Sequence, residues 1–161
     1  AAERPLKGVF HAAAVYDDAA ATNLSWDRFE RVLAPKLGGG WALHQATLDQ
    51  PLDCFVLFSS VTALLGNPGQ ANYVAANLSL EALARARRAA GLPGLAVGWS
   101  AIADAGYLAR HGDVLEDLSQ KMGVAALSAA AALRELERLL NSDHPAVVTL
   151  AALDWRRLRA A

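Results

Sequence analysis

The sequence has little cysteine: Cys54 is the single one among its 161 residues. One cysteine cannot form an intramolecular disulfide, which excludes a disulfide-stabilised secreted scaffold and favours a reducing, cytoplasmic compartment. No apolar run reaches the roughly 18 residues that a membrane-spanning helix needs, so no membrane partner is expected. The first seven residues include charges and Pro5, unlike a secretory signal peptide.

An excess of charge of one sign is also missing. Fifteen Lys and Arg residues are offset by sixteen Asp and Glu residues, and no block of like charge stands out. A nucleic-acid-binding surface needs a basic patch, so nucleic acid is not expected as a partner. The 54% share of hydrophobic residues indicates a compact globular fold instead.

Three motifs of site chemistry are absent. The histidines are scattered and form no ligand pair with Cys54, so no metal site is predicted. Ser59 and Ser60 lack the flanking glycines of a serine hydrolase. No GxGxxG turn follows a predicted strand, because glycines 38–40 lie in a helical pattern and those within 66–69 have the wrong spacing. A dinucleotide site would lack its phosphate-binding turn here.

Short apolar runs alternate with helical patterns along the chain. The runs at 6–15, 54–58, 95–99 and 146–150 have the length of strands. Residues 54–58 show no polar alternation, which indicates a strand covered on both faces, as in a parallel sheet. The predicted fold class is therefore α/β, with strands joined by right-handed crossovers. Four strands suit one half of a doubly wound sheet.

Helical patterns separate these runs. Ser25 is a candidate N-cap for a pattern that continues to residue 48, past Pro35, so a kinked helix or two helices in series are expected. A long helix over 71–90 is expected to end at Gly91, and Ser128 is the expected N-cap of another helix that reaches residue 140. A short helix is expected at 113–121. A loop is expected at 62–70, and the stretch at 102–112 is expected to be irregular.

Four polar residues form the strongest candidate site: Lys36, Ser60, Tyr73 and Asn77. Ser60 follows a predicted parallel strand, where α/β folds place their ligands. Tyr73 and Asn77 are four residues apart and so share a helix face. A phenol can donate a proton to a carbonyl oxygen, and a nearby ammonium such as that of Lys36 would lower the phenol pKa. Ser60 could add a hydrogen bond to the same oxygen.

Each of these residues also has an ordinary structural explanation. Ser60 could belong to a turn, and Tyr73 could be a core residue. Lys36, next to a proline, could be a solvated surface lysine, and Asn77 could satisfy a buried carbonyl. Spacing alone leaves both interpretations open.

Four segments carry a family resemblance: Phe-His-Ala-Ala-Ala at 10–14, Leu-Ala-Pro-Lys at 33–36, Leu-Phe-Ser-Ser at 57–60, and Gly-Asn-Pro-Gly-Gln-Ala-Asn-Tyr-Val-Ala-Ala-Asn at 66–77. They closely resemble the ketoreductase domain of modular polyketide synthases, in the short-chain dehydrogenase/reductase superfamily. The resemblance covers nearly the whole chain. It implies a partial Rossmann-like fold and NADPH-dependent reduction of a 3-oxoacyl thioester, carried on the phosphopantetheine of an acyl carrier protein.

The resemblance implies roles for individual residues. Tyr73 would be the proton donor and Ser60 would orient the carbonyl. Lys36 would contact the nicotinamide ribose and lower the tyrosine pKa, and Asn77 takes a helix position that is lysine in most of the superfamily. The positions that would contact NADPH are His11, Ala12, Ala13, Lys36, Tyr73, Gly98, Trp99 and Ser100.

The resemblance also concerns stereochemistry and the lid. Tyr16 stands in place of the leucine of a Leu-Asp-Asp motif, typical of B-type domains, which form the 3R alcohol. The four implied stereocontrol positions are Asp18, Leu65, Pro68 and Asn72. Ala14 replaces a usual glycine, and Trp-Ser-Ala-Ile at 99–102 departs from the common Trp-Gly-x-Trp. A substrate lid is expected at about 103–123.

The family's first strands, with the phosphate-binding loop, are expected upstream of these segments. Residues 1–161 would then be the carboxyl-terminal portion of a catalytic subdomain, inactive alone and partnered by the amino-terminal half and neighbouring synthase domains. Two alternative functions stay open. One is a non-catalytic structural or carrier-docking module, which NADPH binding would separate from a reductase. The other is epimerisation at the α-carbon, which a deuterium-washout assay would detect.

Overall fold

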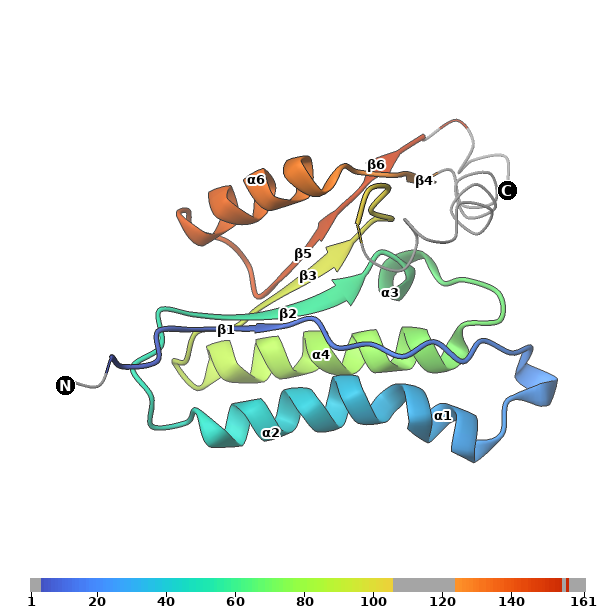
Figure 1. The fold of residues 1–161 in the computed structure, drawn as a ribbon, viewed down its shortest axis with the longest axis horizontal. Helices are drawn as coiled ribbons and strands as arrows, with labels where there is room; N and C mark the ends of the chain where they lie inside the picture. Colours follow the sequence, from blue (N-terminus) through green and yellow to red (C-terminus); the bar gives the residue numbers. More distant parts are fainter. Residues whose placement is uncertain (1–3, 106–123, 155, 157–161) are drawn as a thin grey trace.

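The computed structural model describes residues 4–105, 124–154 and 156. A four-stranded parallel sheet lies at its centre (Figure 1). Its strands are β1 (Gly8–His11), β2 (Cys54–Ser60), β3 (Leu95–Trp99) and β5 (Val147–Leu150), in the spatial order β1-β2-β3-β5. All three strand pairs are parallel, so the predicted α/β class is confirmed.

Helices cover both faces of the sheet and make a three-layer structure (Figure 1). On one face lies α4 (Ala71–Ala89), with α1 (Trp26–Leu33) and α2 (Gly39–Ala46) beside it. On the other face lies α6 (Ala129–Leu140). Phe55 and Leu57 join the core under α4, whereas Val56 joins the core under α6. This double burial explains why the run at 54–58 is apolar without alternation.

Helices α1 and α2 follow one another without a loop, as the pattern past Pro35 predicts. Between them lies η2 (Ala34–Gly38), one turn of π-helix, which contains both Pro35 and Lys36. Proline removes a main-chain donor from the helix ladder, and a π-turn is one way to accommodate that loss. The predicted cap is confirmed, since the Ser25 hydroxyl accepts a hydrogen bond from the Arg28 amide.

The other helix ends also match their sequence signals. Helix α4 ends at Ala89, and Gly91 follows it with a φ of 75°, a left-handed conformation that glycine adopts freely. The Ser128 side chain accepts a hydrogen bond from the Ala131 amide at the start of α6.

Two expectations about local structure need correction, and two further elements were not predicted. Strand β1 covers residues 8–11 rather than 6–15, and the chain then leaves the sheet as an irregular segment. The predicted loop at 62–70 begins with the short helix α3 (Thr62–Leu65), which stops where Gly66 takes a φ of 75°. A short 3₁₀ turn, η1 (Ala21–Asn23), precedes α1. A small antiparallel pair, β4 (Val124–Ala125) with β6 (Ala152–Leu153), was not predicted.

Some expectations concern residues that lie outside the described part of the chain. The short helix at 113–121 lies outside the described residues, as does all of the expected lid except 103–105. Within the described part of the chain, none of the helices has the length and apolar character to cross a membrane. The same part holds no group of three or more His, Cys, Asp or Glu residues that could bind a metal ion.

Candidate active site

The carboxyl ends of three neighbouring strands meet at one end of the sheet. His11 is the last residue of β1, Ser60 of β2 and Trp99 of β3. Tyr73 and Asn77 lie one helical turn apart in the first half of α4, and both are buried. The fold thus places the predicted residues at the strand ends, where parallel α/β proteins bind their ligands.

Lys36 is buried, with 2% of its surface exposed, so it is not a solvated surface lysine. Its ammonium donates a hydrogen bond to the main-chain oxygen of Phe58 at 2.9 Å and lies 5.3 Å from the ring centre of Tyr73. Burial lowers the pKa of Lys36 to about 8. A ring nitrogen of His11 lies 3.2 Å from the Lys36 main-chain oxygen, which ties β1 to η2.

Tyr73 is 8% exposed and packs with Val32 and Ala76 between α1 and α4. Burial raises the pKa of its phenol well above the ordinary value, and the neighbouring phenol of Tyr16 adds to the rise. The polar side chains of Asn77 and Ser60 oppose this rise. The net direction of the pKa is upward, opposite to the lowering expected from the family resemblance. Tyr73 is therefore protonated at neutral pH, which is the form that a proton donor needs.

Asn77 and Ser60, the two polar side chains that lower the pKa of Tyr73, have contacts of their own. The Asn77 amide nitrogen donates to the Tyr73 main-chain oxygen at 2.8 Å, while its Oδ1 is buried without a hydrogen-bond partner in the described structure. The Ser60 hydroxyl accepts hydrogen bonds from the amide and the hydroxyl of Thr62, at 3.2 and 3.0 Å. Because both contacts use its lone pairs, the Ser60 proton stays available for another acceptor.

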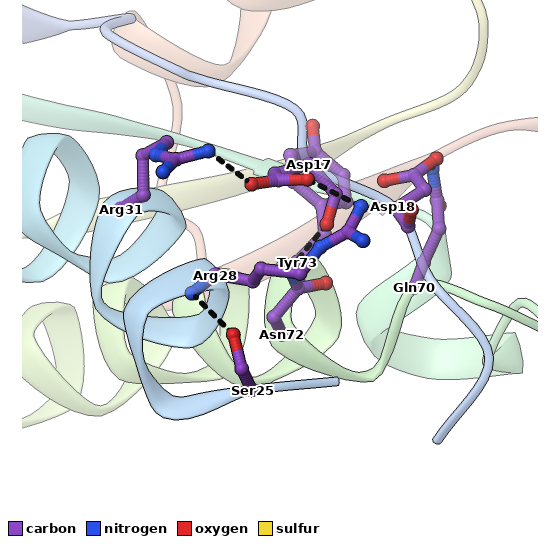
Figure 2. A network of polar contacts seen from close by, with 8 residues as sticks. All are labelled: Asp17, Asp18, Ser25, Arg28, Arg31, Gln70, Asn72 and Tyr73. Atoms are coloured by element: carbon purple, nitrogen blue, oxygen red, sulfur yellow. Dashed lines mark hydrogen bonds and ion pairs between the residues drawn. The ribbon is translucent and has the colours of Figure 1, made fainter. Parts of the chain in front are cut away.

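The segment 15–18 runs across the start of α4 and is held there by polar contacts (Figure 2). The Asp17 carboxylate pairs with Arg28 at 2.5 Å and with Arg31 at 2.7 Å. The Asn72 side chain donates to the Asp17 main-chain oxygen at 2.8 Å, and Gln70 donates to the Asp18 carboxylate at 2.8 Å. Two of the predicted stereocontrol residues, Asp18 and Asn72, therefore meet in one network.

The other two stereocontrol candidates lie outside this network. Leu65, the last residue of α3, is 38% exposed, and Pro68 is an exposed residue of the turn before α4.

Tyr16 belongs to the same segment, and its contact was not foreseen. Its hydroxyl lies 3.3 Å from the hydroxyl of Tyr73, and the two ring centres are 4.9 Å apart. The two residues are 57 positions apart, so no local pattern could reveal the contact. The one hint in the sequence is an aromatic residue where the family motif has leucine.

The predicted cofactor positions occupy the ends of β1 and β3. Ala12 and Ala13 follow β1 directly and are exposed. Gly98 lies in β3, where a Cβ would approach the Thr149 hydroxyl to 2.9 Å. The indole nitrogen of Trp99 is buried and has no partner within the described residues. The Ser100 hydroxyl donates to the Ala125 main-chain oxygen at 2.8 Å.

Comparison with known proteins supplies the family. The family model of the KR domain matches residues 1–104, more than half of the chain. The chain belongs to the KR domain family. It is 46% identical over 158 residues to the phenolphthiocerol synthesis polyketide synthase type I Pks15/1 of Mycobacterium bovis, covering 94% of this chain and 7% of that protein. It is 42% identical over 159 residues to polyketide synthase GfsA of Streptomyces halstedii, covering 99% of this chain and 2% of GfsA.

Solved KR structures share its fold. A structure described as A-type ketoreductases from a modular polyketide synthase matches with a TM-score of 0.89 and 36% identity, covering 96% of this chain and 32% of that one. The first ketoreductase of the tylosin polyketide synthase matches with a TM-score of 0.85 and 43% identity, covering 96% and 33%. The predicted Rossmann-like fold is confirmed, and the chain spans about a third of these ketoreductases.

Members of this reductase superfamily bind NADP(H), and the KR residues at the strand ends fit such a group. They offer a buried cation in Lys36 and, counting partners among the described residues alone, an unpaired acceptor in Asn77 Oδ1 and an unpaired donor in Trp99 Nε1. Buried polar atoms without partners are uncommon in folded proteins and are satisfied when a polar ligand binds. A nucleotide with hydroxyl and amide groups has the donors and acceptors that this set lacks.

Proposed function

We propose that the KR domain to which this chain belongs reduces the 3-oxo group of an acyl thioester, bound to an acyl carrier protein, to a 3-hydroxy group with NADPH. The observation that carries the proposal is the environment of Tyr73. Its phenol is buried and protonated at neutral pH, and it stands on α4 beside the carboxyl ends of the parallel strands. A carbonyl reduction needs such an acid beside the oxygen that becomes an alcohol.

NADPH, when bound, supplies the hydride for the carbonyl carbon. Tyr73 gives its phenolic proton to the carbonyl oxygen as negative charge develops there. Ser60 donates a second hydrogen bond to this oxygen, with the proton that its contacts to Thr62 leave available. The two hydroxyls stabilise the developing oxyanion and fix the orientation of the carbonyl.

Lys36 would hold the nicotinamide ribose of the cofactor, and Asn77 holds the Tyr73 backbone. With a pKa of about 8, the Lys36 side chain is mostly an ammonium at neutral pH and can donate to ribose hydroxyls. Asn77 fixes the first turns of α4 through the Tyr73 main-chain oxygen and offers Oδ1 as an acceptor.

The test of this function uses the complete KR domain, a 3-oxoacyl N-acetylcysteamine thioester and NADPH consumption. Replacing Tyr73 by phenylalanine removes the proton and keeps the ring that packs on Val32. We expect Tyr73→Phe to lose at least about 100-fold in kcat and to bind NADPH as the wild type does. Near-normal turnover of Tyr73→Phe would contradict the role of the phenol.

We propose B-type stereochemistry, which gives the 3R alcohol. The support is the network of Asp18 with Gln70 and of Asn72 with the Asp17 main chain, which gives segment 15–18 one position beside Tyr73. Chiral chromatography of the product is the test. The 3R alcohol is expected, and Gln70→Ala is expected to lower its excess because Asp18 loses its partner. A 3S product from the wild type would overturn the assignment.

We also infer that the 161 residues form the carboxyl-terminal portion of a KR catalytic subdomain. In the described structure β1 pairs with β2 and with no other strand, so one of its edges can receive a further strand. NADPH titration of the 161-residue chain, beside a chain extended upstream, tests this inference. Binding by the extended chain alone supports it, whereas equal binding by both chains overturns it.

A further inference from the structure

We propose that Tyr16 returns a proton to Tyr73 after each reduction, so that its phenol connects the buried acid to solvent. The proposal rests on the proposed function of Tyr73 as proton donor. It gives a catalytic role to Tyr16, the residue that replaces leucine in the Leu-Asp-Asp motif.

The first support is the contact itself. The two hydroxyl oxygens are 3.3 Å apart, and either can be the donor. The two rings also pack against each other with an interplanar angle of 33°, so the hydrogen bond between the hydroxyls is not the single contact between the two side chains. A hydroxyl both donates and accepts, and a pair of phenols can therefore pass a proton in either direction.

The second support is the difference in exposure. Tyr16 is 40% exposed, whereas Tyr73 is 8% exposed. The Lys36 ammonium lies 5.3 Å from the Tyr73 ring centre, but Lys36 is 2% exposed, so it does not bring the phenol to the surface. Among the described residues, Tyr16 is the ionisable side chain that touches both the Tyr73 hydroxyl and the surface of the molecule.

The third support is the anchoring of segment 15–18. Asp17, the next residue, is held by the ion pairs with Arg28 and Arg31 and by the hydrogen bond from Asn72 to its main chain (Figure 2). Asn72 directly precedes Tyr73 on α4, and its Oδ1 accepts from the Tyr73 amide. The Asn72 side chain therefore fixes the main chain beside Tyr16 and at Tyr73.

In the reduction, the Tyr73 O–H bond breaks and its proton joins the carbonyl oxygen, whose carbon has received the hydride of NADPH. A phenolate is left at Tyr73, in a site where burial favours the neutral form. The Tyr16 O–H bond then breaks as its proton moves to the Tyr73 oxygen, and Tyr16 recovers a proton from water. One solvent proton is consumed in each turnover.

Rapid-mixing kinetics on the complete KR domain test this route. Tyr16→Phe removes the hydroxyl and keeps the ring that covers Tyr73. We expect its first turnover within about twofold of the wild type, because Tyr73 starts protonated, and its steady-state rate about tenfold lower. A burst should therefore appear, and added imidazole buffer, as a soluble acid, should restore the steady-state rate.

Tyr16→Leu is the matched variant. Leucine is smaller, so water can reach Tyr73, and we expect a smaller steady-state defect than in Tyr16→Phe. Equal slowing of the first and later turnovers without rescue by imidazole means that Tyr16 only supports the structure, and it overturns the proposal. Unchanged kinetics in Tyr16→Phe overturn it as well.

A second readout needs no turnover. Exchange of the Tyr73 hydroxyl proton with deuterated solvent can be followed at the ζ carbon of carbon-13-labelled tyrosine, assigned with Tyr73→Phe. We expect slower exchange in Tyr16→Phe than in the wild type, and equal exchange overturns the route even if reduction is normal. If the wild type does not reduce the thioester, the proposed function fails, whereas slower exchange still supports the route.

Discussion

Lys36 and Phe58 are joined by a hydrogen bond from a buried ammonium to a main-chain oxygen, 2.9 Å long and 22 residues apart in sequence. Burying a cation against a neutral acceptor costs free energy, because the carbonyl replaces only part of its hydration. The lowered pKa of Lys36 expresses this cost. This free-energy cost falls at the position where the family resemblance implies a cation.

The first prediction concerns stability at alkaline pH. The pKa of Lys36 falls from 10.5 to about 8 on folding, so between these values the unfolded chain binds the additional proton. Stability then rises with pH, and the penalty, about 3 kcal/mol, is present below pH 8 and disappears toward pH 10.5. Denaturant unfolding of the complete domain should show the wild type gaining stability relative to Lys36→Met across this window. Parallel pH curves for the two proteins would contradict the buried ammonium.

The second prediction compares two arginines that bind one carboxylate. Arg28 pairs with Asp17 and also donates to the Asp18 main-chain oxygen, with a side chain 36% exposed, whereas the Arg31 side chain is 62% exposed. Exposed ion pairs contribute little, and salt screens them. We expect Arg28→Ala to lower the free energy of unfolding by about 1–2 kcal/mol and Arg31→Ala by less than about 1 kcal/mol.

A double-mutant cycle with Asp17→Asn checks this ranking. The coupling energy should be larger for Arg28 than for Arg31, and high salt should reduce it mainly for Arg31. The reverse ranking would mean that exposure does not decide the strength of these pairs.

The third prediction uses two glycines of one continuous helix. A Cβ on Gly38 would meet nothing within 4 Å, whereas one on Gly40 would lie 3.0 Å from Leu80 and 3.6 Å from His11. Alanine is favoured over glycine in a helix by about 1 kcal/mol. Gly38→Ala should therefore raise the melting temperature, while crowding should remove this gain in Gly40→Ala. Equal gains in both variants would show that the packing around Gly40 yields freely.

Patterns that depend on neighbouring residues predicted much of this molecule. The limits of β3 agree with its apolar run, and the Ser25 and Ser128 caps lie where a hydroxyl precedes a helical pattern. The placement of Ser60 and Tyr73 at the strand ends follows from the same logic, since parallel topology gathers the carboxyl ends of strands.

Contacts across long separations could not be predicted in this way. The burial of Lys36 depends on where the helix continues past Pro35, and a π-turn there changes which face each residue occupies. The Tyr16–Tyr73 contact depends on the path of an irregular segment, which has no periodicity. Helix α3 was missed because a four-residue helix just before Gly66 and Pro68 has too few positions for a period.

The strand order has a consequence for synthesis on the ribosome. Strands β1, β2, β3 and β5 stand side by side in the order in which they are made, so each new strand can add to the edge left by the previous one. Their outer face is covered late, because Leu136 and Leu139 of α6 pack on Val56 and Val97. Until residue 140 has left the exit tunnel, a growing chain carries a bare apolar sheet face, and such a face is prone to aggregation.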